Sequence, residues 1–164
     1  MRKWIILLSA VIIVLALFFL SKNENVNKTG IIVCDTQLFE DSNCTNPSIK
    51  IPKNDLVYVI SDGKNSYYVQ MPVMSIPPTE GYTHKNCVSF DTNGFLNANY
   101  GVLQPNTVLY NTASLSDVYS RTENEEVVNI LERKEKWILC DFIGGREPKW
   151  VESKYITYEL KYVK

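Results

Sequence analysis

Histidine is almost absent from the sequence, and positive charge is not in excess. One histidine among 164 residues excludes a metal centre built from several histidines, and it excludes a relay of histidines. The 17 Lys and Arg residues are balanced by 18 Asp and Glu residues, so the basic footprint of a nucleic-acid-binding protein is missing. Seven glycines and seven prolines are too few for a collagen-like or low-complexity chain.

One long apolar run is present, and it lies at the N-terminus. Residues 4–20, WIILLSAVIIVLALFFL, contain no charged side chain. At about 1.5 Å per residue, a helix of this length is roughly 25 Å long, near the lower limit for crossing a bilayer. Arg2 and Lys3 precede the run and favour an N-terminus on the inside. We therefore expect residues 1–20 to be an uncleaved signal anchor, although a cleaved signal peptide is the alternative.

The rest of the chain is expected outside the cytoplasm. It would belong to a single-pass protein of the cell membrane, or to a secreted protein if the N-terminal segment is cleaved. Residues 21–29, SKNENVNKT, are polar and without periodicity, which predicts a short tether. All 18 acidic residues follow residue 20, and this mild acidity argues against a polybasic membrane patch.

An internal repeat divides the remaining residues into two copies. The matching segments are 30–32 with 101–103, 36–39 with 107–110, 54–60 with 124–130, 67–69 with 137–139, 81–83 with 149–151 and 87–90 with 155–158. Their spacing drifts only from 71 to 70 to 68 residues. We therefore predict two domains, residues 30–90 and 100–164, joined by a linker at 91–99 that is rich in turn formers.

Both copies have the pattern of short β-strands. Residues 57–60 and 66–71 are rich in β-branched and aromatic side chains, and a polar turn at 61–65 separates them. At a spacing of 70, Val57 corresponds to Val127 and Gln70 corresponds to Cys140. The repeat predicts a strand over residues 123–131 as well, so the expected fold class is all-β.

The order of these segments resembles bacterial SH3-like (SH3b) domains. The second copy carries Leu109-Tyr110, Val127-Val128, Trp137-Ile138-Leu139 and Trp150-Val151, with Tyr155-Ile156 at the end; the first carries Leu38-Phe39, Val57, Tyr67-Tyr68-Val69 and Gly81-Tyr82-Thr83, with Cys87-Val88 at the end. The chain departs from the family pattern at Tyr82, where Trp is usual, at Cys87, where Tyr is usual, and at Lys149, where Gly is usual. The resemblance implies two tandem small β-barrels that bind cell-wall peptide or a protein partner.

Aromatic residues are the candidate binding residues. SH3-like folds offer a peptide groove with an aromatic floor between loops. If this chain has such a groove, its contributors are Phe39, Tyr67, Tyr82, Tyr110, Trp137 and Trp150. The alternative is that these rings fill the small cores. His84 is expected to be a surface turn residue.

Four cysteines, at positions 34, 44, 87 and 140, contain no Cys-x-x-Cys motif, so zinc and redox sites are not predicted. An exported chain can form disulfides. Cys34 and Cys87 lie on neighbouring strands of the barrel that the resemblance implies, whereas a bond from Cys34 to Cys44 would close the first loop. Cys140 is the candidate for a buried thiol.

Together these features predict a binding protein, with no enzyme activity, no cofactor, no metal and no nucleic-acid partner. We expect a membrane-tethered adaptor that recognises envelope peptide, peptidoglycan or a partner protein. The alternative is a structural accessory subunit of a membrane or envelope complex, without a wall ligand.

Overall fold

The computed structural model describes residues 24–72 and 79–161. The predicted signal anchor, residues 1–20, lies outside these ranges. No helix among the described residues has the length and apolar character needed to span a membrane.

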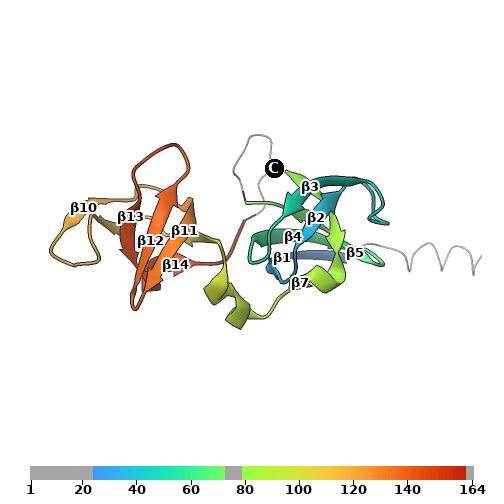
Figure 1. The fold of residues 1–164 in the computed structure, drawn as a ribbon, viewed down its shortest axis with the longest axis horizontal. Coiled ribbons are helices and arrows are strands. Elements are labelled where there is room, and N and C mark those ends of the chain that lie inside the picture. Colours follow the sequence, from blue (N-terminus) through green and yellow to red (C-terminus); the bar gives the residue numbers. More distant parts are fainter. Residues whose placement is uncertain (1–23, 73–78, 162–164) are drawn as a thin grey trace, which may run out of the picture.

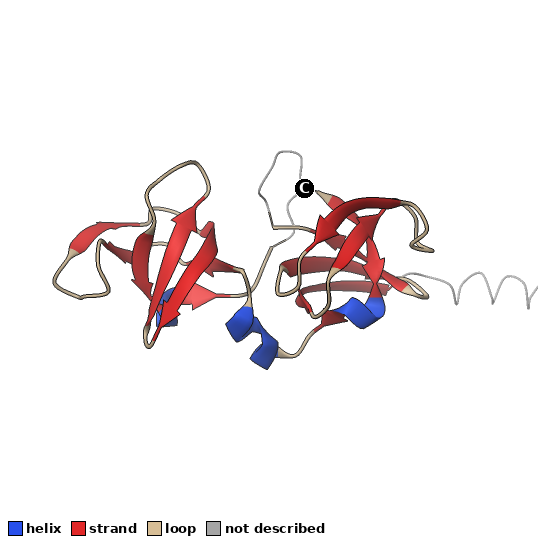
Figure 2. Ribbon diagram, in the orientation of Figure 1, coloured by secondary structure: helices blue, strands red, loops and turns tan. Residues whose placement is uncertain are grey.

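The described chain is all-β and forms two domains, as the sequence predicts (Figures 1 and 2). The first contains β1 (Glu24–Ile32), β2 (Thr36–Phe39), β3 (Pro47–Ile51), β4 (Leu56–Asp62), β5 (Ser66–Gln70), β6 (Glu80–His84), the 3₁₀ turn η1 (Lys85–Cys87) and β7 (Val88–Ser89). The 3₁₀ helix η2 (Thr92–Asn97) follows. The second contains β8 (Tyr100–Leu103), β9 (Val108–Tyr110), β10 (Val118–Arg121), β11 (Glu126–Lys134), β12 (Trp137–Phe142), β13 (Lys149–Glu152), η3 (Ser153–Tyr155) and β14 (Ile156–Thr157).

Each domain is one seven-stranded sheet, and both sheets have the same strand order. The orders are β3-β2-β6-β5-β4-β1-β7 and β10-β9-β13-β12-β11-β8-β14. The first strand of each domain therefore lies between the fourth and the last strand. The two copies therefore share their strand order as well as their sequence pattern.

The register of the sheets corrects part of the predicted repeat. Gly30 lies opposite Val57, and Gly101 lies opposite Val128, so Val57 corresponds to Val128 and not to Val127. In the same way Cys140 corresponds to Val69, not to Gln70. A shift of one residue moves every side chain of a strand to the other face. Val127 and Val128 are both apolar, and for this reason the sequence pattern did not distinguish the two registers.

The predicted tether is also partly wrong, because β1 already begins at Glu24. Lys28 and Thr29 lie opposite Val59 and Tyr58 of β4. Ladder hydrogen bonds come from the backbone and do not require apolar side chains. Polar residues can therefore extend β1 as far as β4 continues beside it.

Each domain has its own apolar core. In the first, the core consists of Ile32, Leu38, Ile51, Val57, Val59, Val69 and Val88. In the second, it consists of Leu103, Leu109, Val128, Ile138, Cys140, Phe142, Val151 and Ile156. Complete burial of such a side chain stabilises a fold by about 1.5–3 kcal/mol.

A third apolar cluster connects the domains. It contains Ile31 and Leu56 of the first domain, Val102 of the second, and Ala98 and Leu160 from the connecting and C-terminal segments. Asn99 donates its backbone N–H to the carbonyl of Asn54, and its own carbonyl accepts from Ile130. The linker thus contacts a turn of one domain and a strand of the other.

Candidate functional site

A row of aromatic side chains crosses three strands of the first domain. Phe39 of β2 lies opposite Tyr82 of β6, which lies opposite Tyr68 of β5. Residues directly opposite each other in antiparallel strands share one face of the sheet. The ring centroids of Tyr68 and Tyr82 are 4.9 Å apart, and the ring of Phe39 meets the imidazole of His84 edge-on at 5.1 Å.

Glu80 holds the end of this row in place. Its carboxylate accepts a hydrogen bond from the Tyr68 hydroxyl at 2.9 Å and another from the Gln70 amide at 2.8 Å. The Tyr68 side chain is therefore held at its hydroxyl group as well as at its backbone.

The second domain has an equivalent row. Tyr110 of β9 lies opposite Trp150 of β13, which lies opposite Leu139 of β12. The ring of Tyr110 meets the ring of Trp137 edge-on at 5.1 Å.

The structure thus brings five of the six candidate aromatic residues onto two equivalent faces. Phe39, Tyr110 and Trp137 are each only 6% exposed, so they form the floor of these faces. Tyr82 and Trp150 are partly exposed. Tyr67 does not belong to either face, because its side chain packs against the first core and its ring meets Phe90 at a centroid distance of 5.6 Å.

A shallow pocket of about 590 Å³ lies beside the row of the first domain. It is lined by Asp35, Thr36, Gln37, Phe39, Lys50, Ile51, Pro52 and His84. Lys50 and His84 are exposed at its rim. Sequence reasoning missed these polar members, because the pocket joins the consecutive strands β2 and β3 to β6, which is far from them in the chain. The available signal was that the only histidine stands where the other copy has Glu152.

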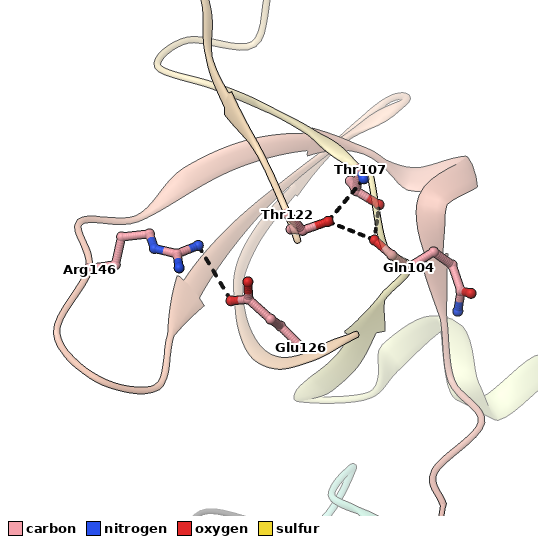
Figure 3. A network of polar contacts seen from close by, with 5 residues as sticks. All are labelled: Gln104, Thr107, Thr122, Glu126 and Arg146. Carbon is pink, nitrogen blue, oxygen red and sulfur yellow. Dashed lines mark hydrogen bonds and ion pairs between the residues drawn. The ribbon is translucent and has the colours of Figure 1, made fainter. Parts of the chain in front are cut away.

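In the corresponding region of the second domain, buried hydrogen bonds hold the turn together (Figure 3). Thr107 and Thr122 both donate their hydroxyl groups to the carbonyl of Gln104, at 2.7 and 2.8 Å. The Thr122 hydroxyl also accepts the backbone N–H of Thr107 at 2.9 Å. To one side, Arg146 and Glu126 form an ion pair at 3.4 Å (Figure 3).

The cysteines form one disulfide and leave two thiols. Cys34 is bonded to Cys87, so the end of β1 is tied to the turn before β7. Burial raises the pKa of the Cys140 thiol to about 12. Burial and the nearby carboxylate of Asp41 raise the pKa of the Cys44 thiol. Neither thiol has the lowered pKa of a catalytic nucleophile.

Within residues 24–72 and 79–161, no three His, Cys, Asp or Glu side chains are grouped in a way that could hold a metal ion.

Comparison with known proteins gives a likeness of shape only. No protein-family model and no curated protein sequence matches the chain. A solved structure of NlpC2 from Trichomonas vaginalis is similar at 10% identity with a TM-score of 0.35, covering 82% of this chain and 49% of the other. A structure of NlpC1 from the same organism is similar at 11% identity with a TM-score of 0.34, covering 84% and 48%. The chain therefore spans about half the length of these structures, and we base no functional conclusion on them.

Proposed function

We propose that the chain is a membrane-tethered, extracytoplasmic adaptor that binds an envelope ligand through two SH3-like domains and catalyses no reaction. The ligand is cell-wall peptide, peptidoglycan or a partner protein. The observation that carries the proposal is the aromatic row, Phe39–Tyr82–Tyr68, which lies beside an open pocket and has an equivalent in the second domain.

Several features support SH3-like domains. Each domain is small, and its first strand pairs with both the fourth and the last strand. A 3₁₀ turn precedes the last strand in both copies, at residues 85–87 and 153–155. The aromatic rows lie on strands β2, β5 and β6 and on their equivalents, and SH3 domains bind peptides in grooves lined by aromatic side chains.

The tether rests on the sequence. Residues 4–20 are apolar and follow two basic residues, which is the pattern of a segment with its N-terminus inside. A disulfide at Cys34–Cys87 agrees with export, since disulfides persist in oxidising compartments.

A binding role without catalysis agrees with the chemistry of the described residues. The two free thiols have raised pKa values. His84 contacts an aromatic ring and lies at the rim of an open pocket, a setting suited to binding.

Co-sedimentation with purified cell-wall sacculi tests the wall-binding form of the proposal. The full chain, kept in detergent at low salt, should pellet with the sacculi. The double variant Tyr82→Ala/Trp150→Ala should pellet less, because it removes the partly exposed ring from each face. Wild-type protein that stays in the supernatant would rule out a wall ligand.

A second candidate function, a structural subunit of an envelope complex, is favoured by the edge of the second domain. Among the described strands, β10 pairs only with β9, and Leu115, Val118 and Tyr119 at this edge are all more than half exposed. Unpaired apolar edges are typical sites of strand pairing between chains. Crosslinking in intact cells distinguishes the two candidates: a protein partner crosslinked through residues 115–119 favours the subunit.

A further inference from the structure

The two copies have the same topology, but their equivalent surfaces beside the aromatic floor differ in chemistry. By register, Lys50 of the first domain corresponds to Arg121 of the second, and His84 corresponds to Glu152. Ile51 corresponds to Thr122, because each is the partner of the equivalent threonine, Thr36 or Thr107.

In the second domain these positions are occupied by contacts within the domain. A guanidinium N–H of Arg121 donates to the carbonyl of Asn106 at 3.2 Å. The Thr122 hydroxyl donates to Gln104, as Figure 3 shows. Glu152 forms an ion pair with Lys154 at 3.1 Å, and Glu123 adds a second carboxylate nearby in sequence. On this surface the positive charges of Arg121 and Lys154 are therefore balanced by the carboxylates of Glu123 and Glu152, and the side chain in the place of His84 is a carboxylate, which repels an anionic ligand.

In the first domain the exposed residues at these positions are Lys50 and His84, and the position of Thr122 is taken by the buried side chain of Ile51. Ile51 has no hydroxyl group with which to close the turn, and Lys50 has no ion-pair partner among the described residues. The imidazole of His84 contacts the ring of Phe39 and is otherwise exposed. The one carboxylate in the pocket, Asp35, already accepts the backbone N–H of Lys53 at 3.1 Å. The rim thus presents an ammonium group and an imidazole beside the exposed ring of Pro52, above a floor to which Phe39 contributes.

We propose that the first domain alone is the ligand-binding copy, and that its pocket takes the carboxylate end of a peptide whose last side chain is apolar. The Lys50 ammonium pairs with the carboxylate, because a cation without a partner beside an apolar wall is complementary to this group. The apolar side chain packs over Pro52, above the floor that Phe39 forms. The second domain has the carboxylate of Glu152 where the first has His84, and its Arg121 already donates to a backbone carbonyl, so it serves as a structural partner. This inference rests on the proposed binding function and narrows it from two domains to the pocket of the first.

Titration with a matched pair of small probes tests the charge requirement. The probes are N-acetylphenylalanine, which has a carboxylate, and N-acetylphenylalanine amide, which has the same body without the charge. The full chain in detergent, labelled with ¹⁵N, is followed by the backbone amide signals of Thr36, Gln37 and Lys50 and of their equivalents Thr107, Val108 and Arg121. The carboxylate probe should give saturable shifts in the first set only, and the amide should bind at least about tenfold more weakly. Equal binding of both probes, or equal shifts in both domains, would overturn the assignment.

Charge-reversal variants give the second measurement. Lys50→Glu should weaken binding of the carboxylate probe at least about tenfold, and the matched change Arg121→Glu should leave it unchanged. Both side chains are exposed on edge strands, so neither change disturbs a core. Unchanged binding by Lys50→Glu would refute the proposal.

The same variants separate this inference from the proposed function. If wild-type protein binds sacculi and Lys50→Glu binds them equally well, the pocket assignment is wrong while wall binding stands. If wild-type protein does not bind sacculi but binds the carboxylate probe through Lys50, the proposal of a wall ligand is wrong. The carboxylate then belongs to a partner protein.

Discussion

At the scale of single residues, Cys140 and Asp55 are both buried and both have raised pKa values, but they contribute to stability in different ways. Cys140 is completely buried in the second core, at the position that Val69 occupies in the first. Asp55 is 3% exposed and accepts a hydrogen bond from the Asn99 amide at 2.6 Å. The cysteine behaves as a small apolar side chain, whereas the aspartate connects its domain to the linker.

Substitutions at Cys140 should distinguish the effect of side-chain shape on the free energy of unfolding from the effect of side-chain polarity. Cys140→Val reproduces the other copy, and we expect it to change the free energy of unfolding by less than about 1 kcal/mol. Cys140→Ser places a hydroxyl group among apolar side chains and should cost about 1–3 kcal/mol. Denaturant titration of both variants measures this difference. A serine variant as stable as the valine variant would contradict the burial of this position.

Asp55 should make stability depend on pH. Burial raises its pKa in the folded state above the ordinary value, and the hydrogen bond from Asn99 opposes part of this rise. A carboxyl group with a raised folded pKa favours the folded state most below its unfolded pKa, and this contribution is lost as pH rises through the folded pKa. Wild-type stability relative to Asp55→Asn should therefore fall as the pH rises from the ordinary carboxyl value of 3.8 toward neutral. A difference that stays constant over this range would contradict the expected ionisation.

At the scale of strands, each domain depends on the close passage of its first strand beside its last. A Cβ atom at Gly30 would lie 2.6 Å from Cγ1 of Val88, and one at Gly101 would lie 2.6 Å from Cγ2 of Ile156. Both neighbours are branched at Cβ and cannot turn away freely. The glycine that opens each copy is therefore required by packing.

Alanine at either glycine should destabilise its own domain. We expect Gly30→Ala and Gly101→Ala each to cost about 1–3 kcal/mol, from the shift of the closing strand. Gly94→Ala is the matched control, because its Cβ would have an ordinary contact of 3.4 Å with Ile31. Thermal unfolding of the three variants provides the comparison, and a Gly30→Ala variant as stable as the control would show that the strands separate easily.

The strands also show how far sequence patterns predict this molecule. The two copies and the all-β class follow from periodicity and spacing, because buried positions along strands must be apolar, whereas the candidate aromatic residues came from the resemblance to SH3-like domains. The register of β4 and β11 did not follow, since Val127 and Val128 fit either face equally. Lys50 and His84 were missed for another reason: the pocket exists only when β3 and β6 pair with the two edges of β2.

At the scale of the whole molecule, the two domains are coupled by more than their linker. Leu160, which follows the last strand, is 8% exposed in the cluster that also contains Ile31, Leu56 and Val102. Its backbone N–H donates to the hydroxyl of Thr29 in β1, at 2.7 Å. The C-terminal segment of the second domain thus returns to the first strand of the first. The second domain can in this way support the domain to which we assign binding.

Removal of this contact should uncouple the domains. We expect wild-type protein to unfold in a single calorimetric transition, because both domains share one apolar cluster. Leu160→Ala should cost about 2–5 kcal/mol of that shared stability and split the unfolding into two transitions. Leu131→Ala, at a position 56% exposed in the second domain, is the control and should change stability by no more than about 0.5 kcal/mol. If Leu160→Ala unfolds in one transition at the wild-type temperature, the cluster does not couple the domains, and the second domain cannot act through it on the ligand-binding copy.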